Sequence, residues 1–273
     1  GAFLAGSQNL RYSPDGTRLL TTWGQALLFD AGTGDLLRAL APPRPSAVDA
    51  TIDAGDWADG GRTVLGANHE RVFAWDADTG ELRASRAFDK RAFVLDVRAS
   101  DARRAVAVVD NTAVLTFGLP ELTARLAASG HAQAVRAVAV STRSKRVLSS
   151  DNESLKSWDL STGACLWTRP AGECFALEMS PDGTQCYAAF AYHSHVFDVN
   201  MGAALSSGEQ PLEVACWLDD GRLVHLGYRE EAEGATLMVG EGSDAYIVDR
   251  IRSEFLRCVP ALSADGRRAL VWE

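Results

Sequence analysis

Two histidines in the stretch YHSHVFD come nearest in this sequence to a metal site. His193 and His195 are separated by one residue, so on a β-strand their side chains would lie on the same side. A zinc site in a protein generally needs three or four ligands, and no further ligand with suitable spacing accompanies the pair. We therefore expect no metal site here, and we expect no cofactor.

Sequence motifs for nucleophilic, metalloprotease or nucleotide chemistry are absent. The patterns GxSxG, HExxH and GxxxxGK[ST] do not occur. The acidic pair Asp219-Asp220 belongs to a turn pattern, where both carboxylates would be solvated. We expect no catalytic residues, and the sequence predicts a protein that is not an enzyme.

Polar and aromatic residues that suit a protein interface recur in short gaps between apolar runs. These candidates are Trp23, Asn68, His69, Asp110, Asn111, Asp151, Asn152, Tyr192 and His193, with Arg91 in a neighbouring gap. Binding residues gather on loops because loops vary while strands stay fixed, and exposed aromatics and arginines anchor interfaces. We expect these residues to contact a protein or peptide. For Trp23, packing against a neighbouring strand unit stays open as the alternative.

An internal repeat would bring these distant residues together. The segment SPDGT occurs at 13–17 and again at 180–184, and related turns recur about every 42 residues. The repeated position holds Gly16, Gly60, Ala102, Ser144, Gly183, Gly221 and Gly266, which makes seven turns. Proline presets φ, aspartate bonds the nearby backbone and glycine accepts a positive φ, so each turn predicts a β-hairpin.

A second marker follows five of these turns by 13 to 15 residues. It reads Phe29-Asp30, Trp75-Asp76, Phe117-Gly118, Trp158-Asp159 and Phe197-Asp198, and three copies continue into Thr-Gly. Each marker indicates a third strand, a turn and a fourth strand. We expect the aromatic rings to pack between units and the aspartates to turn the chain.

The order SPDG, WD and TG, with one Gly130-His131 pair, resembles the WD-repeat β-propeller family in a bacterial form with degenerate repeats. The resemblance covers nearly the whole chain and implies an all-β fold with one four-stranded antiparallel sheet per blade. Seven turns then predict a seven-bladed propeller in a single domain over 1–273. The seventh blade is expected to be incomplete, because its aromatic marker would fall after Glu273. The candidate loop residues would share one face of the ring.

The hydrogen-bond network of that family is expected to be weak here. The family often joins a histidine, a serine or threonine, an aspartate and a tryptophan, with the aspartate six residues before the tryptophan. Those positions hold Trp23, His69, Asn111, Asn152 and Ala191. Only the unit with His131, Ser149 or Ser150, Asn152 and Trp158 comes near. We therefore expect apolar packing between blades to dominate.

Composition narrows the class of partner. The formal net charge of the 273 residues is −9, which disfavours nucleic acid and anionic membranes because both need clustered Lys and Arg. No apolar run approaches the ~18 residues of a membrane helix. The five cysteines are odd in number and form no CxxC pair, which argues against a disulfide framework and suggests a reducing, cytoplasmic setting.

The function that these features predict is a non-catalytic scaffold or sensor propeller that binds a protein or peptide. We expect it to be the recognition domain of a larger bacterial signalling or effector protein. The alternative is a quinoprotein-like propeller, a cofactor-binding enzyme or periplasmic assembly factor, because WDADTGELRAS and WDLSTGACLW resemble the docking motif of that family. A hydrolase propeller, which would need channel carboxylates holding calcium, and a sensor of a small ligand stay open as minor alternatives.

Overall fold

The structure, a computed structural model, is built almost entirely from β-strands. It describes residues 10–22, 24–42, 51–68, 70–87, 97–101, 104–109, 113–119, 121–141, 143–191, 193–208, 212–228, 235–239, 246–251, 259–262 and 269–272. Over this part of the chain the only helical element is the short 3-10 turn η1 (Asp59–Gly61). No helix there is long and apolar enough to cross a membrane. The expected all-β fold is confirmed.

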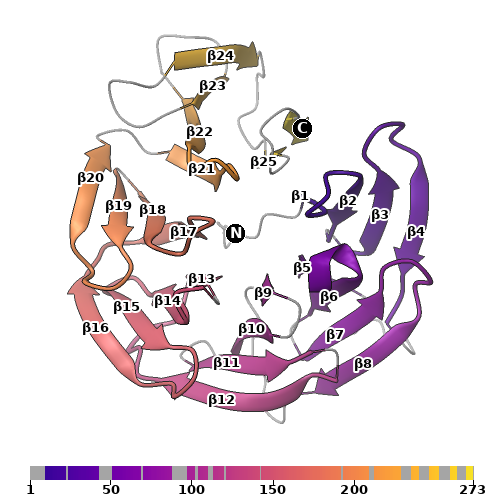
Figure 1. The fold of residues 1–273 in the computed structure, drawn as a ribbon, viewed down its shortest axis with the longest axis horizontal. Coiled ribbons are helices and arrows are strands. Elements are labelled where there is room, and N and C mark those ends of the chain that lie inside the picture. The colour runs from indigo at the N-terminus through magenta and orange to yellow at the C-terminus, as the bar shows by residue number, and fades with distance from the viewer. Residues whose placement is uncertain are drawn as a thin grey trace.

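Successive antiparallel sheets are arranged around a common centre, as Figure 1 shows. Four of them are β1–β4 (Leu10–Tyr12, Arg18–Thr21, Ala26–Asp30, Leu36–Leu40), β5–β8 (Ala54–Ala58, Thr63–Ala67, Arg71–Asp76, Leu82–Ala87), β13–β16 (Ala137–Ser141, Arg146–Ser150, Ser154–Asp159, Cys165–Pro170) and β17–β20 (Cys174–Met179, Gln185–Phe190, Ser194–Asp198, Ala204–Gly208). Their strands pair in sequence order. In the ribbon the first strand of each lies toward the centre and the fourth toward the rim. This is the arrangement of a β-propeller with four-stranded blades.

The remaining strands form two further four-stranded sheets and one pair. The sheets are β9–β12 (Val97–Asp101, Arg104–Val109, Ala113–Gly118, Thr123–Ser129) and β21–β24 (Leu212–Trp217, Leu223–Tyr228, Ala235–Val239, Tyr246–Ile251). The pair is β25–β26 (Val259–Leu262, Ala269–Trp272). These sheets are described mainly by their backbone.

The predicted seven-bladed count, with an incomplete seventh blade, requires correction. The structure describes four blades with all four strands, in both backbone and side chains: β1–β4, β5–β8, β13–β16 and β17–β20. The prediction was wrong as a count of four-stranded blades because it counted hairpin turns. One hairpin needs two strands and one blade needs four, and β25–β26 has two.

The two SPDGT turns have the hydrogen bonds that their residues predict. Asp15 Oδ1 accepts from the Thr17 N–H at 3.0 Å and from the Ser13 hydroxyl at 2.6 Å. The second copy, at 180–184, repeats both bonds at 2.9 and 2.6 Å. The turn glycines have φ of 69° and 73°, a region that favours glycine. The same five residues therefore close the first hairpin in two different blades.

The aspartates after the aromatic markers close the outer turns of the four complete blades. In each, Oδ1 accepts from two backbone N–H groups, two and three residues onward, for Asp30, Asp76, Asp159 and Asp198. The Thr79 N–H, with the Arg83 guanidinium and the Asp78 N–H, lowers the pKa of Asp76 to about 2 against the opposing effect of burial. These aspartates are turn residues, as expected.

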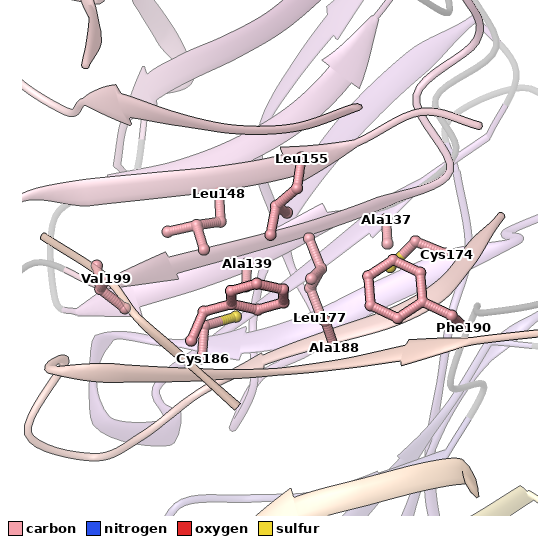
Figure 2. Close-up of a cluster of buried hydrophobic side chains, with 11 residues drawn as sticks. Ala137, Ala139, Leu148, Leu155, Cys174, Leu177, Cys186, Ala188, Phe190 and Val199 are labelled. Atoms are coloured by element: carbon pink, nitrogen blue, oxygen red, sulfur yellow. The ribbon is translucent and has the colours of Figure 1, made fainter. Parts of the chain in front are cut away.

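Apolar packing between neighbouring blades forms the core. Trp75 is fully buried in a cluster that includes Leu28 and Leu40 of the preceding blade. Trp158 is buried in a second cluster, beside Val114 of sheet β9–β12 and Val135. Figure 2 shows a third cluster, in which side chains of β13–β16 face those of β17–β20. Its members are Ala137, Ala139, Leu148, Leu155, Cys174, Leu177, Cys186, Ala188, Phe190, Phe197 and Val199.

Candidate functional site: a hollow between two blades

Four of the ten predicted partner-binding residues lie in the described part of the chain: Asn68, Asp151, Asn152 and His193. Trp23, His69, Arg91, Asp110, Asn111 and Tyr192 lie outside the described residues. For these four residues the predicted position on a binding face can be compared with the position in the structure.

Asn68 and Asp151 are turn residues with little surface to offer a partner. Asn68 is buried, and its Oδ1 accepts from the Glu70 and Arg71 N–H groups at 3.0 and 2.8 Å. Asp151 is also buried, and its Oδ1 accepts from the Glu153 and Ser154 N–H groups at 2.9 and 2.6 Å. Asparagine and aspartate commonly close turns in this way. Their side chains support loops from within, whereas Asn152 is exposed.

Asp151 also completes a buried hydrogen-bond network in the blade β13–β16. The His131 ring contacts Asp151 Oδ2 through Nδ1 at 3.0 Å and the Ser149 hydroxyl through Nε2 at 2.6 Å. Trp158 Nε1 donates to the same hydroxyl at 2.7 Å. The family spacing predicts that Asn152 fills the aspartate position of this network, which is wrong, because the preceding residue, Asp151, fills it. The network in this blade is complete rather than weak.

One protonation pattern satisfies every member of this network. Trp158 donates to Ser149, Ser149 donates to His131 Nε2, and His131 Nδ1–H donates to the Asp151 carboxylate. Burial lowers the pKa of His131 below its ordinary value, against the opposing effect of Asp151. Burial alone would raise the pKa of Asp151, but the Glu153 N–H, His131 and the Ser154 N–H together lower it to about 2. The stable pair is a neutral imidazole on an ionised carboxylate.

This network has the serine–histidine–aspartate order of hydrogen bonds found in a hydrolytic triad. Unlike the serine of a triad, however, its serine is not accessible to a substrate. Ser149, Asp151 and the His131 ring are buried, and the Trp158 indole closes over the serine hydroxyl. A substrate carbonyl must reach the nucleophile and leave room for donors to its oxygen. No substrate can approach Ser149, so the network holds the blade together.

An open hollow of about 570 Å³ lies between β16 and the sheet β17–β20. It is lined on one side by the segment Arg169–Gly172 and on the other by Phe190, His193, His195, Phe197 and the segment Gly202–Ala204. The size falls within the range of small-molecule and side-chain binding pockets. His193, a predicted binding residue, lies on its wall.

Four aromatic rings form one wall of the hollow. His193 stacks on Phe190 with ring centroids 4.9 Å apart and an interplanar angle of 19°. The His195 ring centroid lies 4.9 Å from that of His193, edge to face, and 5.5 Å from that of Phe197, in a tilted arrangement. Phe190 and Phe197 also belong to the core between the two blades, where Figure 2 labels Phe190 at one end of the cluster. The rigid core thus fixes the position of the wall.

The opposite wall is held by Arg169 at the end of β16. Its Nε donates to the Gly202 carbonyl at 3.0 Å and its Nη2 to the Met201 carbonyl at 2.8 Å. Trp167, two residues earlier, donates from Nε1 to the Val199 carbonyl at 3.0 Å. These bonds tie one blade to the β19–β20 turn of the next, so the hollow has a preformed shape.

The histidine pair does not extend into a larger metal cluster. Across the described residues, no group of three or more His, Cys, Asp or Glu side chains gathers as metal ligands would. His195 Nδ1 lies 3.3 Å from the Ser206 carbonyl, which it reaches as an N–H donor. This tautomer leaves Nε2 as an acceptor. The pair therefore offers hydrogen bonds to a ligand in the hollow.

Sequence reasoning missed the hollow itself. It identified the two histidines, but not Arg169, Phe190 or Phe197 as parts of one site. A signal was present, since aromatic residues recur along 190–197. The partner wall comes from the preceding blade, about 20 residues earlier, and no local pattern links the two.

Comparison with known proteins supports the fold. A chain in the crystal structure of a mitotic checkpoint complex superposes with a TM-score of 0.82, covering 99% of this chain and 84% of that one. The fold is that of a β-propeller. At 14% sequence identity the similarity concerns the fold alone. No protein-family model and no curated protein matches the sequence.

Proposed function

We propose that this propeller is a non-catalytic recognition module that binds a protein or peptide segment in the hollow between β13–β16 and β17–β20. The observation that carries the proposal is the preformed hollow, with aromatic rings on one wall and an arginine on the other. Concave sites with an apolar floor and a few fixed polar groups are typical ligand sites. Aromatic and arginine side chains are also the commonest interface anchors.

Two further features are consistent with this proposal. Met201, beside the hollow, is 64% exposed, and an exposed methionine suits an adaptable contact surface. The chain that superposes on this one comes from the crystal structure of a mitotic checkpoint complex. We extend the proposal to a scaffold or sensor role in the cytoplasm, as part of a larger bacterial signalling protein with WD-like repeats.

Selection from an unbiased displayed library of 12-residue peptides tests this function. We expect enriched peptides whose affinity falls at least about tenfold on His193→Ala, because an anchoring contact typically contributes ~2 kcal/mol or more. Ala203→Trp, which fills the hollow from an exposed position, should have the same effect without loss of core packing.

Asn152→Ala is the control, because Asn152 is exposed on the β14–β15 loop and does not line the hollow. It should leave affinity within about twofold. The proposal fails if no peptide is enriched, or if the selected peptides bind His193→Ala and Ala203→Trp as tightly as the unaltered protein.

A further inference from the structure

The charge of Arg169 is held in place but not neutralised. Three backbone carbonyls, those of Gly202, Met201 and Thr168, accept from its Nε, Nη2 and Nη1 at 3.0, 2.8 and 3.3 Å. Among the described residues no Asp or Glu forms an ion pair with it. A guanidinium has five N–H groups, so two remain available for an incoming acceptor.

None of the described residues that line the hollow is an Asp or Glu, and the nearby Asp198 carboxylate accepts from the Asn200 and Met201 N–H groups. The described lining of the hollow comprises one arginine, two histidines, two phenylalanines and small or apolar residues. The chain as a whole has a net charge of −9. The described lining therefore carries one formal positive charge, at Arg169, and no formal negative charge, which favours a negative group over a positive one at this point.

An apolar floor lies beside this charge. Phe190 and Phe197 are 3% and 9% exposed, and both still contribute to the wall of the hollow. Exposed Met201 adjoins it at Gly202. A ligand that places a large apolar side chain against these rings and a carboxylate against Arg169 satisfies both features.

The strands around the hollow favour a peptide as the occupant. β16 and β20 are each the last strand of a sheet, with a neighbour on one side only in the described structure. Such an edge presents backbone groups to an extended chain. The hollow is open, so a chain can enter and leave it.

From these features we infer that the hollow selects an acidic peptide segment that carries a large apolar side chain, an inference that rests on the proposed function. The aromatic wall takes the apolar side chain. The available N–H groups of Arg169 bind a carboxylate of the peptide in a charge-assisted hydrogen bond. Selectivity for acid over base is the property that distinguishes this inference from general peptide binding.

Two displayed libraries of 12-residue peptides with the same apolar positions provide the test. One allows only Asp and Glu at the remaining positions, and the other only Lys and Arg. We expect enrichment from the acidic library, and its best peptide should bind at least about tenfold more tightly than its lysine counterpart. Net charge alone would favour the basic library on a protein of −9, so the prediction opposes the non-specific effect.

Arg169→Gln should reduce the preference for acid to about twofold or less while the thermal midpoint stays within a few degrees. The matched control is Arg62→Gln, an exposed arginine of another blade that pairs with Asp59. It should preserve the preference. Equal or stronger binding of the basic peptides, or an unchanged preference in Arg169→Gln, would overturn the inference.

Peptide binding in the hollow and selectivity for acidic peptides can be contradicted separately. If the unbiased library yields binders that depend on His193 but show no acid preference, peptide binding stands and the acidic selectivity is wrong. If no library yields a binder that depends on the hollow, both are wrong.

Discussion

At the scale of single residues, the network of His131, Ser149, Asp151 and Trp158 shows how burial determines protonation. The histidine stays neutral because its charged form would lose solvation, and the aspartate stays ionised because three donors face it. Removing one partner leaves a buried polar group unsatisfied, which costs about 1–3 kcal/mol. The free energy of unfolding should therefore depend on pH and on each hydrogen bond of this network.

Stability should fall as the pH falls from 7 to 5. Because the pKa of folded His131 is below its ordinary value of 6.5, the unfolded chain binds a proton in this range that the folded chain does not. Asp151 and the turn aspartates have lowered pKa values, so their stabilising effect is lost only below about pH 4. Urea unfolding at several pH values measures both ranges.

His131→Gln supplies the comparison for this prediction. It should be less stable at pH 7 and should lose less stability between pH 7 and 5 than the unaltered protein does. An identical slope in both proteins would show that His131 does not cause the effect.

Trp158→Phe should destabilise the fold through one hydrogen bond and a smaller ring. The indole N–H that reaches Ser149 at 2.7 Å disappears, while most of the apolar contact with Val138 and Val147 is kept. We expect a loss of about 1–3 kcal/mol in the free energy of unfolding, compared with about 3–5 kcal/mol for Trp158→Ala. Chemical denaturation of both variants measures whether this hydrogen bond contributes to the free energy of unfolding. A Trp158→Phe variant as stable as the original protein would contradict the prediction.

At the scale of strands and turns, equivalent positions use the same bond between neighbouring blades. Trp57 Nε1 on β5 donates to the Arg11 carbonyl on β1 at 3.1 Å. Trp217 Nε1 on β21 donates to the Glu178 carbonyl on β17 at 3.0 Å. Each tryptophan immediately precedes the hairpin segment of its unit. The repeat therefore extends to the contacts between sheets and is not confined to the turns.

Alanine variants of two turn glycines distinguish the cost of backbone strain from the cost of a steric clash between blades. Gly183 and Gly221 both have positive φ, 73° and 85°, so alanine at either costs about 1–2 kcal/mol. A Cβ at Gly183 would lie 2.2 Å from Ser141 Oγ of the preceding blade, whereas none of the described atoms lies within 4 Å of one at Gly221. Gly183→Ala should therefore cost about 1–3 kcal/mol more than Gly221→Ala in urea unfolding. Equal losses would mean that the serine moves aside freely.

At the scale of the whole molecule, the sequence contained the repeat and its four-strand unit but not the assembly of units. Spacing of SPDGT and of the aromatic-aspartate pairs predicts strands and turns because those signals are local. The predicted number of blades was wrong because each turn motif indicates only a two-stranded hairpin, whereas a blade needs four strands. The acid of the buried network was misplaced because Asp151 opens its turn seven residues before Trp158, one more than the family spacing.

The candidate site was only partly predictable for the same reason. His193 was chosen from its loop position, and the structure places it on the hollow. Asn68 and Asp151 occupy comparable loop positions and yet face inward as turn acceptors. Position within a repeat does not specify whether a polar side chain faces solvent, since that depends on the neighbouring blade.

Hydrogen–deuterium exchange with a selected peptide tests most directly whether ligands bind in the hollow rather than across the loop face. Amides of unpaired backbone report local burial and opening. Saturating peptide should slow exchange at 169–172 and 202–204, which line the hollow, and leave 68–71 and 151–154 unchanged. Slower exchange at 68–71 and 151–154, with none at the hollow, would contradict the account.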